Sequence, residues 1–214
     1  MVRPSPPNAG VRTRGRPRAD DMRDTRADLL RVAGELFAAN GYAGTSVTDI
    51  GAGANVTVPV IYQRFGNKAG LFVAVAEDVY TRGLELLRET FSAASTFEEA
   101  VDGALRDFGG LHRVDPTIGA LVVTVLVEAE RDDELGRALQ PSLSALRAFC
   151  DDIADLAPVE LAPDKKSRRE LSRALVSLFS GIMISAGMLH RPPEYEAMVT
   201  VLRRMIATGT ADRG

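Results

Sequence analysis

Hydrophobic residues recur along most of the chain with the spacing of amphipathic helices. The first such segment begins near Asp24, and its apolar residues follow the i, i+3, i+4, i+7 pattern of a helix with one buried face: Leu29, Leu30, Ala33, Leu36 and Phe37. The pair Asn40-Gly41 follows, and such a pair is typical of a helix C-terminus. The pattern therefore predicts a first helix that ends at this pair.

Two much shorter helices are expected next. Ser46, with Asp49 three residues later, resembles a capping box and predicts a short helix over about 47–54. Asn55 suits a left-handed backbone position in the turn that follows. Thr57 is then placed to cap a third helix. Three helices joined by tight turns predict a helix-turn-helix unit.

The rest of the chain is also helical by pattern. Helices are expected over about 68–91, 97–112, 117–130, 134–156, 165–190 and 195–207. The apolar run "IGALVVTVLV" at 118–127 has the composition of a buried strand, but no second strand-like segment exists to pair with it. The predicted fold class is therefore all-α with about nine helices, of which the first three form a small N-terminal domain and the others a larger C-terminal domain.

Composition and charge divide the chain into three parts. Residues 1–22 are rich in Pro, Gly and Arg, and are predicted to form a disordered basic arm. Residues 23–70 would be the helix-turn-helix domain and residues 71–214 the C-terminal domain. The first 68 residues hold ten Lys or Arg and six Asp or Glu, which gives a net charge of +4. Because the whole chain has a net charge of −3, residues 69–214 carry −7. A basic N-terminal segment and an acidic remainder predict an anionic partner for the N-terminal segment only.

Few features suggest catalysis, a cofactor or a membrane. His112, His190 and the single cysteine, Cys150, stand alone in the sequence, whereas a metal site needs clustered ligands. "GAGANV" lacks the third glycine of a dinucleotide-binding loop and follows no strand. The longest apolar run is about half of the ~20 residues that cross a bilayer. We expect a cytoplasmic protein that is not an enzyme, with no cofactor, no metal and no membrane association.

Residues 45–72, "TSVTDIGAGANVTVPVIYQRFGNKAGLF", together with the upstream "LLRVAGELFAANGYAGTS", resemble the TetR family of one-component bacterial transcriptional regulators. The resemblance covers residues 24–72. It implies an all-α homodimer whose N-terminal domain reads operator DNA and whose C-terminal domain holds a small-molecule pocket and the dimer interface. It also implies that ligand binding moves the helix after the recognition helix and so changes the spacing of the two DNA readers.

The third helix is the expected recognition helix, held on its domain by Val56, Ile61 and Phe65. Its expected outer face enters the major groove and comprises Thr57, Val58, Pro59, Val60, Tyr62 and Gln63.

Gln63 matches an adenine edge, and Val58, Pro59 or Val60 would contact thymine methyl groups. Phosphate contacts are expected from Tyr62, Lys68 and Ser46. By family position, Thr48 is a further candidate for a base or phosphate contact, and Arg64 would reach either a guanine or a phosphate. The family commonly has a polar or basic residue and glycine at Val58-Pro59, histidine at Gln63-Arg64 and glycine at Asn55, so no operator sequence carries over.

The motif "RGRP" at 14–17 matches the core of AT-hook peptides, in which arginines lie in the narrow minor groove of A·T-rich DNA. Arg14, Arg16 and Arg18 would then form an arm that reads the groove beside the major-groove site. The alternative, a solvated tail that attracts DNA without specificity, stays open.

The C-terminal half is expected to supply a mostly apolar pocket and the dimer interface. Pocket candidates are Tyr80, Phe108, Val123, Val127 and Met183, and the acidic balance of this half favours neutral or cationic ligands. The interface candidates are small or apolar residues of the last two helices: Ser177, Gly181, Ser185, Met198, Val201 and Met205.

Two functions fit these observations. The favoured one is a ligand-responsive repressor that a small molecule releases from a palindromic double-stranded operator. The alternative is an architectural DNA-binding protein whose C-terminal domain only dimerises.

Overall fold

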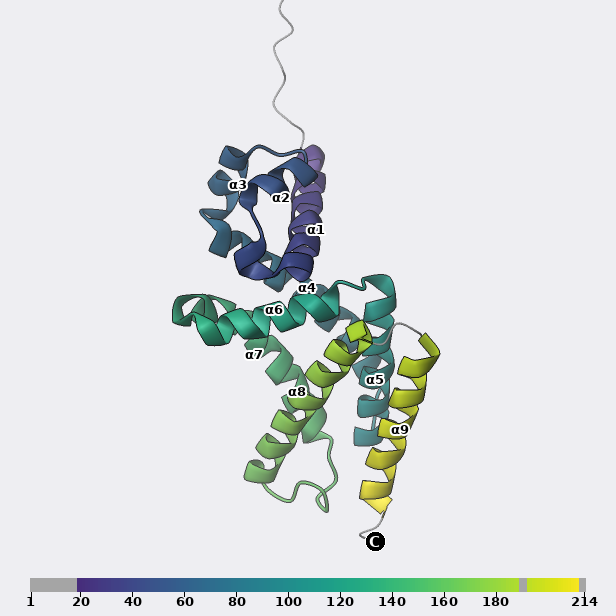
Figure 1. Cartoon of the computed structure of the whole chain (residues 1–214). Coiled ribbons are helices and arrows are strands. Elements are labelled where there is room, and N and C mark those ends of the chain that lie inside the picture. The colour runs from purple at the N-terminus through teal and green to yellow at the C-terminus, as the bar shows by residue number, and fades with distance from the viewer. Residues whose placement is uncertain (1–18, 189–191, 212–214) are drawn as a thin grey trace, which may run out of the picture.

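A computed structural model describes residues 19–188 and 192–211 of the chain. Its described residues form nine α-helices and no strand (Figure 1), which confirms the all-α prediction. The helices are α1 (Ala19–Gly44), α2 (Val47–Gly53), α3 (Val58–Phe65), α4 (Lys68–Phe91), α5 (Phe97–Val114), α6 (Ile118–Arg131), α7 (Asp133–Asp155), α8 (Lys165–Met188) and α9 (Pro192–Ala211). The arm residues Arg14, Arg16 and Arg18 lie outside the described residues.

Helix α1 differs from its prediction at the start. It begins at Ala19, so the last four residues of the predicted disordered arm, residues 19–22, are helical. At its other end the predicted stop is present, because Gly41 has non-helical angles (φ 71°, ψ 173°) and kinks the chain. The single hydrogen of the buried Thr45 hydroxyl then donates a hydrogen bond shared between the carbonyl oxygens of Gly41 (2.7 Å) and Leu36 (3.0 Å), which fixes the path into α2.

Helix α9 also starts earlier than expected, at Pro192 instead of Tyr195. Proline suits the first turn of a helix, where its missing N–H has no partner to lose. The helix packs on α5, where the Tyr195 ring lies so close to Gly109 that a Cβ atom there would collide with it. A glycine in α5 therefore lets α9 dock.

Helices α4 and α6 connect the two parts of the molecule (Figure 1). Helix α4 packs against α1 and α3 with its N-terminal half, and against α5 and α7 further on. Helix α6 lies across the end of α1, and α8 packs on α5, α6 and α7. The predicted domain boundary at residues 70/71 stays a prediction, because α4 contributes buried residues to both parts.

The buried side chains form a single cluster that runs from α1 to α9. Where α1 and α4 meet, the rings of Phe37 and Phe72 pack edge to face with centroids 5.0 Å apart. In α7 and α8, Phe149 and Phe179 are fully buried. Cys150 in α7 is also buried, and this burial raises the pKa of its thiol to about 12.

Candidate DNA interface and buried cavity

The turn between α2 and α3 is built by close backbone approach. Asn55 takes the predicted left-handed conformation (φ 53°). A Cβ atom at Gly51 would lie 2.6 Å from the carbonyl oxygen of Val56, and one at Gly53 would lie 2.8 Å from Cγ1 of Val32. These two glycines therefore allow close packing around the turn.

Helix α3 is held on the domain by one side. Ile61 is fully buried, and Val58 and Phe65 are half-buried against the core. These residues are spaced i, i+3 and i+7, so they share one stripe of the helix. Val58, which the sequence analysis placed on the outer face, therefore packs partly against the core, and Val60 is also half-buried; their contacts with DNA stay a prediction.

The other predicted contact residues of α3 are exposed: Thr57, Pro59, Tyr62, Gln63 and Arg64. The aromatic side chain of Tyr62 is 46% exposed. A hydroxyl, a phenol, an amide and a guanidinium thus share one surface. Such groups bind base edges and phosphate oxygens.

Two capping predictions need correction. Thr57 occupies the N-cap position of α3, but its side chain makes no capping hydrogen bond, which leaves the hydroxyl unused there. The Ser46 hydroxyl oxygen accepts from the backbone N–H of Thr48 (3.1 Å), and not from that of Asp49 as in a full capping box. The hydroxyl hydrogen of Ser46 is still able to donate to a phosphate, and Thr48 is exposed beside it.

Lys68 has partners within the protein. Its Nζ lies 3.4 Å from the carbonyl oxygen of Ala43, which accepts its hydrogen bond, and 4.6 Å from the centroid of the Tyr42 ring. Burial, followed by the nearby carboxylates of Asp132 and Glu128, raises the pKa of Tyr42. The lysine predicted as a phosphate contact therefore also fastens the start of α4 to the end of α1.

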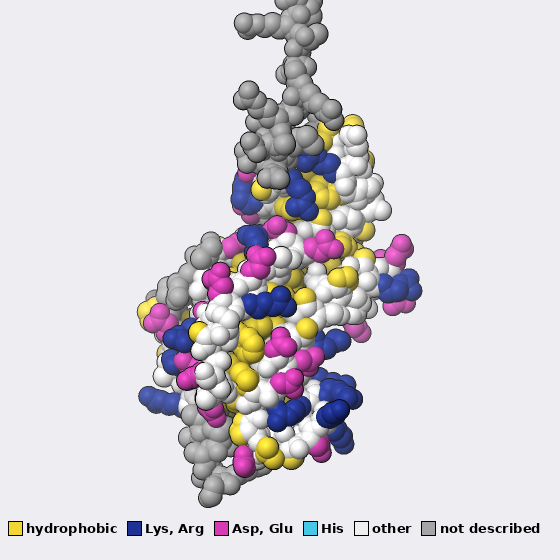
Figure 2. Space-filling view, turned by 180° about the vertical axis from the view of Figure 1, so that it is seen from behind, with side chains coloured by type: hydrophobic (Ala, Val, Ile, Leu, Met, Phe, Trp, Pro, Cys, Tyr) yellow, Lys and Arg dark blue, Asp and Glu magenta, His cyan; other side chains and the backbone are white. Residues whose placement is uncertain are grey.

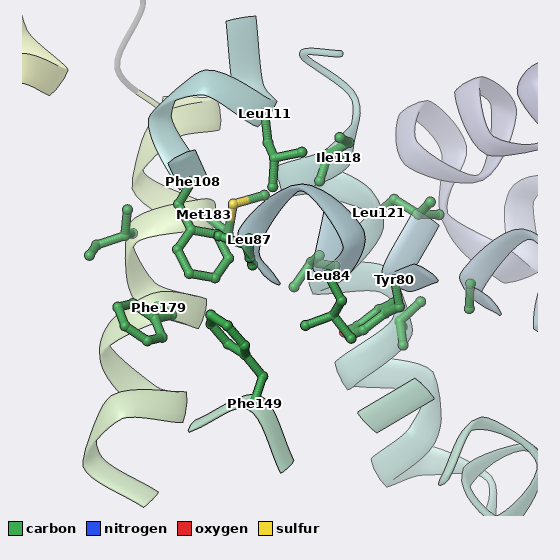
Figure 3. Packing of buried hydrophobic residues seen from close by; sticks show 14 of the residues in the cluster. Tyr80, Leu84, Leu87, Phe108, Leu111, Ile118, Leu121, Phe149, Phe179 and Met183 are labelled. Carbon is green, nitrogen blue, oxygen red and sulfur yellow. The ribbon is translucent and has the colours of Figure 1, made fainter. Parts of the chain in front are cut away.

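A cavity of about 50 Å³ lies between α4, α5, α6, α7 and α8. Its described lining residues are apolar or hydroxyl-bearing, and many of them are shown in Figure 3: Val79, Tyr80, Gly83, Leu84, Leu87, Phe108, Leu111, Ile118, Val122, Leu146, Phe179, Ser180 and Met183. Tyr80, Phe108 and Met183 of the predicted pocket are in this lining.

Val123 and Val127, the other two predicted pocket residues, do not line the cavity. Ile118 and Val122 do so instead. Val123 directly follows Val122 and therefore points about 100° away from it around the helix. Val127 lies on the same side as Val123 and is 38% exposed.

The residues predicted for the dimer interface lie on accessible faces of α8 and α9. Ser177 and Gly181 are exposed, and a Cβ atom at Gly181 would meet no atom of the described residues within 4 Å beyond the backbone of α8 itself. Val201 is 55% exposed and Met205 is 63% exposed. Ser185 and Met198 are half-buried.

The surface of the C-terminal part is mixed in charge. Figure 2 shows Lys and Arg side chains interspersed with Asp and Glu, with hydrophobic side chains between them. Among the residues that the structure describes, no three His, Cys, Asp or Glu side chains are grouped to hold a metal ion. No helix in the same part of the chain is both long and apolar enough to cross a membrane.

These helices define an all-α helix-turn-helix protein with a larger helical domain. The sequence profile of bacterial regulatory proteins of the tetR family matches residues 29–75. A repressor of Mycobacterium tuberculosis, Rv3405c, is 34% identical over 79 residues, which are 37% of this chain; the chain spans 42% of that relative's length. Residues 29–75 therefore carry the sequence features of the tetR-family DNA-binding region.

Solved structures agree with the fold over most of the chain. A TetR-like transcriptional regulator from Rhodococcus is 20% identical and has a TM-score of 0.69, over 92% of this chain and 100% of that protein. FadR from Bacillus subtilis, solved in complex with stearoyl-CoA, is 18% identical and has a TM-score of 0.63, over 83% of this chain and 97% of FadR. At these identities the likeness concerns the fold.

Proposed function

We propose that this protein is a DNA-binding transcriptional regulator, a repressor that a small molecule releases from its operator. The observation that carries the proposal is the physical link between two sites. The exposed face of α3 belongs to a TetR-family domain, and α4, which follows directly, forms one wall of the cavity.

The DNA-binding surface would be the exposed face of α3 with the N-terminus of α2. Gln63 would read an adenine edge and Pro59 a thymine methyl group. Thr57, Tyr62 and Ser46 would donate to phosphates. Val58 also contributes to anchoring the helix.

Ligand binding would reach α3 through α1 and α4. Ligand pockets commonly measure about 300–1,000 Å³, whereas this cavity is about 50 Å³, so an effector would have to push the walls apart. Helix α4 packs on α1 and α3, and α6 packs on α1. The hydroxyl of Thr124 in α6 lies 3.5 Å from the carbonyl oxygen of Phe37 in α1. Displaced walls would therefore shift the DNA-binding helices.

A homodimer would form through α8 and α9. The exposed Gly181 allows a second helix to approach closely, and Val201 and Met205 supply apolar area that this chain leaves uncovered. Two α3 helices related by a two-fold axis would read a palindromic operator.

The experiment begins with selection of bound sequences from random double-stranded DNA. The enriched sequence is then titrated with wild-type protein, with Gln63→Glu and with Gln140→Glu. Gln63 and Gln140 are both exposed, so neither change disturbs the core, but only the first places a negative charge on the reading face. We expect at least a tenfold loss for Gln63→Glu and none for Gln140→Glu.

A second step separates a repressor from an architectural protein. A library of small molecules is screened for release of the selected DNA. Enrichment of a sequence that no compound releases would favour the architectural function, and the absence of any enriched sequence would exclude both.

A further inference from the structure

Tyr80 is the one lining residue of the cavity with a buried, unpaired polar group in the described part of the chain. Its side chain is 8% exposed, and its hydroxyl oxygen has no hydrogen-bond partner there. Buried polar groups are almost always paired, and an unpaired one destabilises the protein. Burial raises the pKa of this phenol to about 12, so the hydroxyl keeps its proton and remains a donor at neutral pH.

The surroundings of this hydroxyl are apolar. None of the described lining residues is charged, and Ser180 supplies the other hydroxyl. Figure 3 shows the rings of Phe108 and Phe179 next to each other, with centroids 4.9 Å apart. A charged ligand would lose its hydration here without gaining a counter-charge. A pure hydrocarbon would leave the Tyr80 hydroxyl unpaired.

We infer that the effector is a small, uncharged, mainly apolar molecule with one hydrogen-bond acceptor, and that the Tyr80 hydroxyl binds this acceptor. The inference rests on the proposed function and specifies its ligand class. An engineered dry cavity of about 150 Å³ binds benzene, so a cavity of about 50 Å³ has to open to admit even one ring. A compact effector limits that opening.

The first test needs no ligand. Tyr80→Phe removes only the hydroxyl, and Tyr62→Phe makes the same change at a side chain that is 46% exposed. Because an unpaired buried hydroxyl is removed, Tyr80→Phe is expected to raise the midpoint of thermal unfolding of the full chain, with no change for Tyr62→Phe. An unchanged or lowered midpoint for Tyr80→Phe would show that the hydroxyl is already satisfied, and would overturn the inference.

The second test uses four probes of similar size: acetophenone, isopropylbenzene, benzoate and benzylamine. Titration calorimetry on the full chain should give acetophenone a two- to tenfold higher affinity than isopropylbenzene, as about one net hydrogen bond provides. Benzoate and benzylamine should not bind. Tyr80→Phe should lose this preference and bind acetophenone no more tightly than isopropylbenzene, because the ketone oxygen would then be buried without a donor.

Several results would contradict the inference. These are a tighter affinity for either charged probe, an acetophenone preference that persists in Tyr80→Phe, or no binding of the neutral probes at millimolar concentration. The DNA selection separates this failure from that of the proposed function. If a DNA sequence is enriched but the probes show no Tyr80-dependent preference, only the ligand class is wrong. If no DNA is enriched, the proposed function fails whatever the probes do.

Discussion

The ammonium group of Lys68 lies 4.6 Å from the centroid of the Tyr42 ring, so the first residue of α4 is fastened to the end of α1. The ring also lies 5.0 Å from that of Phe72. A cation–π contact at a partly exposed site contributes about 0.5–1 kcal/mol. This pair joins the helix that lines the cavity to the helix that supports the DNA-binding unit.

We expect Lys68→Met to lower the free energy of unfolding by about this amount, ~0.5–1 kcal/mol, as measured by urea denaturation. Tyr42→Phe keeps the aromatic ring and should change stability little, whereas Tyr42→Leu should resemble Lys68→Met. Equal stability of the Leu and Phe variants would show that the ring face contributes nothing. If Lys68 also binds a phosphate, Lys68→Met should lower the salt slope of DNA binding by about 0.9, as expected for one phosphate contact.

Gly51 should be far less tolerant of a methyl group than Gly44. An added Cβ atom at Gly51 would lie 2.6 Å from the backbone carbonyl oxygen of Val56, which cannot move without opening the turn. At Gly44 the nearest atom would be Cβ of Asn40 at 3.5 Å, an ordinary contact. Gly51→Ala is expected to destabilise the chain by about 1–3 kcal/mol, the range for overpacked sites.

Gly44→Ala should stay within about 0.5 kcal/mol of the wild type, as most surface substitutions do. Urea denaturation measures both variants. A Gly51→Ala protein as stable as Gly44→Ala would show that the turn between α2 and α3 is not closely packed.

The dimer proposal predicts a selective effect at Gly181. Apart from the backbone of α8 itself, no atom of the described residues lies within 4 Å of a Cβ placed there, so Gly181→Leu should leave the protomer folded while blocking a second helix. Light scattering should show a shift from dimer to monomer at micromolar concentration, with weaker binding to the selected DNA. Ala138→Leu places the same leucine side chain at an exposed residue of α7 and should stay dimeric. A dimeric Gly181→Leu protein would place the interface elsewhere.

The helical pattern in the sequence was sufficient to predict most elements. Apolar spacing predicted a helix over about 68–91, which agrees with the observed bounds of α4. Asn55 correctly indicated the left-handed turn. The pattern was weakest at helix starts, because Pro192 permits a first turn that an amphipathic stripe does not reveal. It also placed the arm's end too late, since the sequence of residues 19–22 carries no amphipathic stripe that would mark the start of a helix.

Sequence reasoning was less successful where the rotation of a helix decides the outcome. Val122 and Val123 are both valines next to each other in the sequence, but only Val122 lines the cavity. The repeat of Ile118, Leu121, Val122 and Val125 was a usable signal for the buried stripe of α6. The unpaired hydroxyl of Tyr80 left no such signal, because it depends on every helix around it.

The last prediction separates the arm from the recognition helix. Deleting residues 1–18 removes five arginines and no acidic residue, and leaves α1 complete from Ala19. Each phosphate that the arm neutralises contributes about −0.9 to the slope of log affinity against log salt. The deletion should therefore weaken binding to selected and random DNA alike and make the slope shallower. Replacing Arg14, Arg16 and Arg18 by Gln tests the charges without shortening the chain.

Gln63→Ala should act differently, because an amide that reads an adenine carries no charge. Its loss should cost about 1–3 kcal/mol at one base pair, with binding to random DNA and the salt slope nearly unchanged. If the arm also reads the minor groove, the arginine variant should lose a preference for A·T pairs at a fixed distance from the Gln63 position. Titration of the variants against selected, flank-altered and random DNA at several salt concentrations distinguishes these effects. An arm deletion without effect on any affinity would make residues 1–18 a passive tail, and a Gln63→Ala protein that is weakened equally on all sequences would assign Gln63 to the DNA backbone.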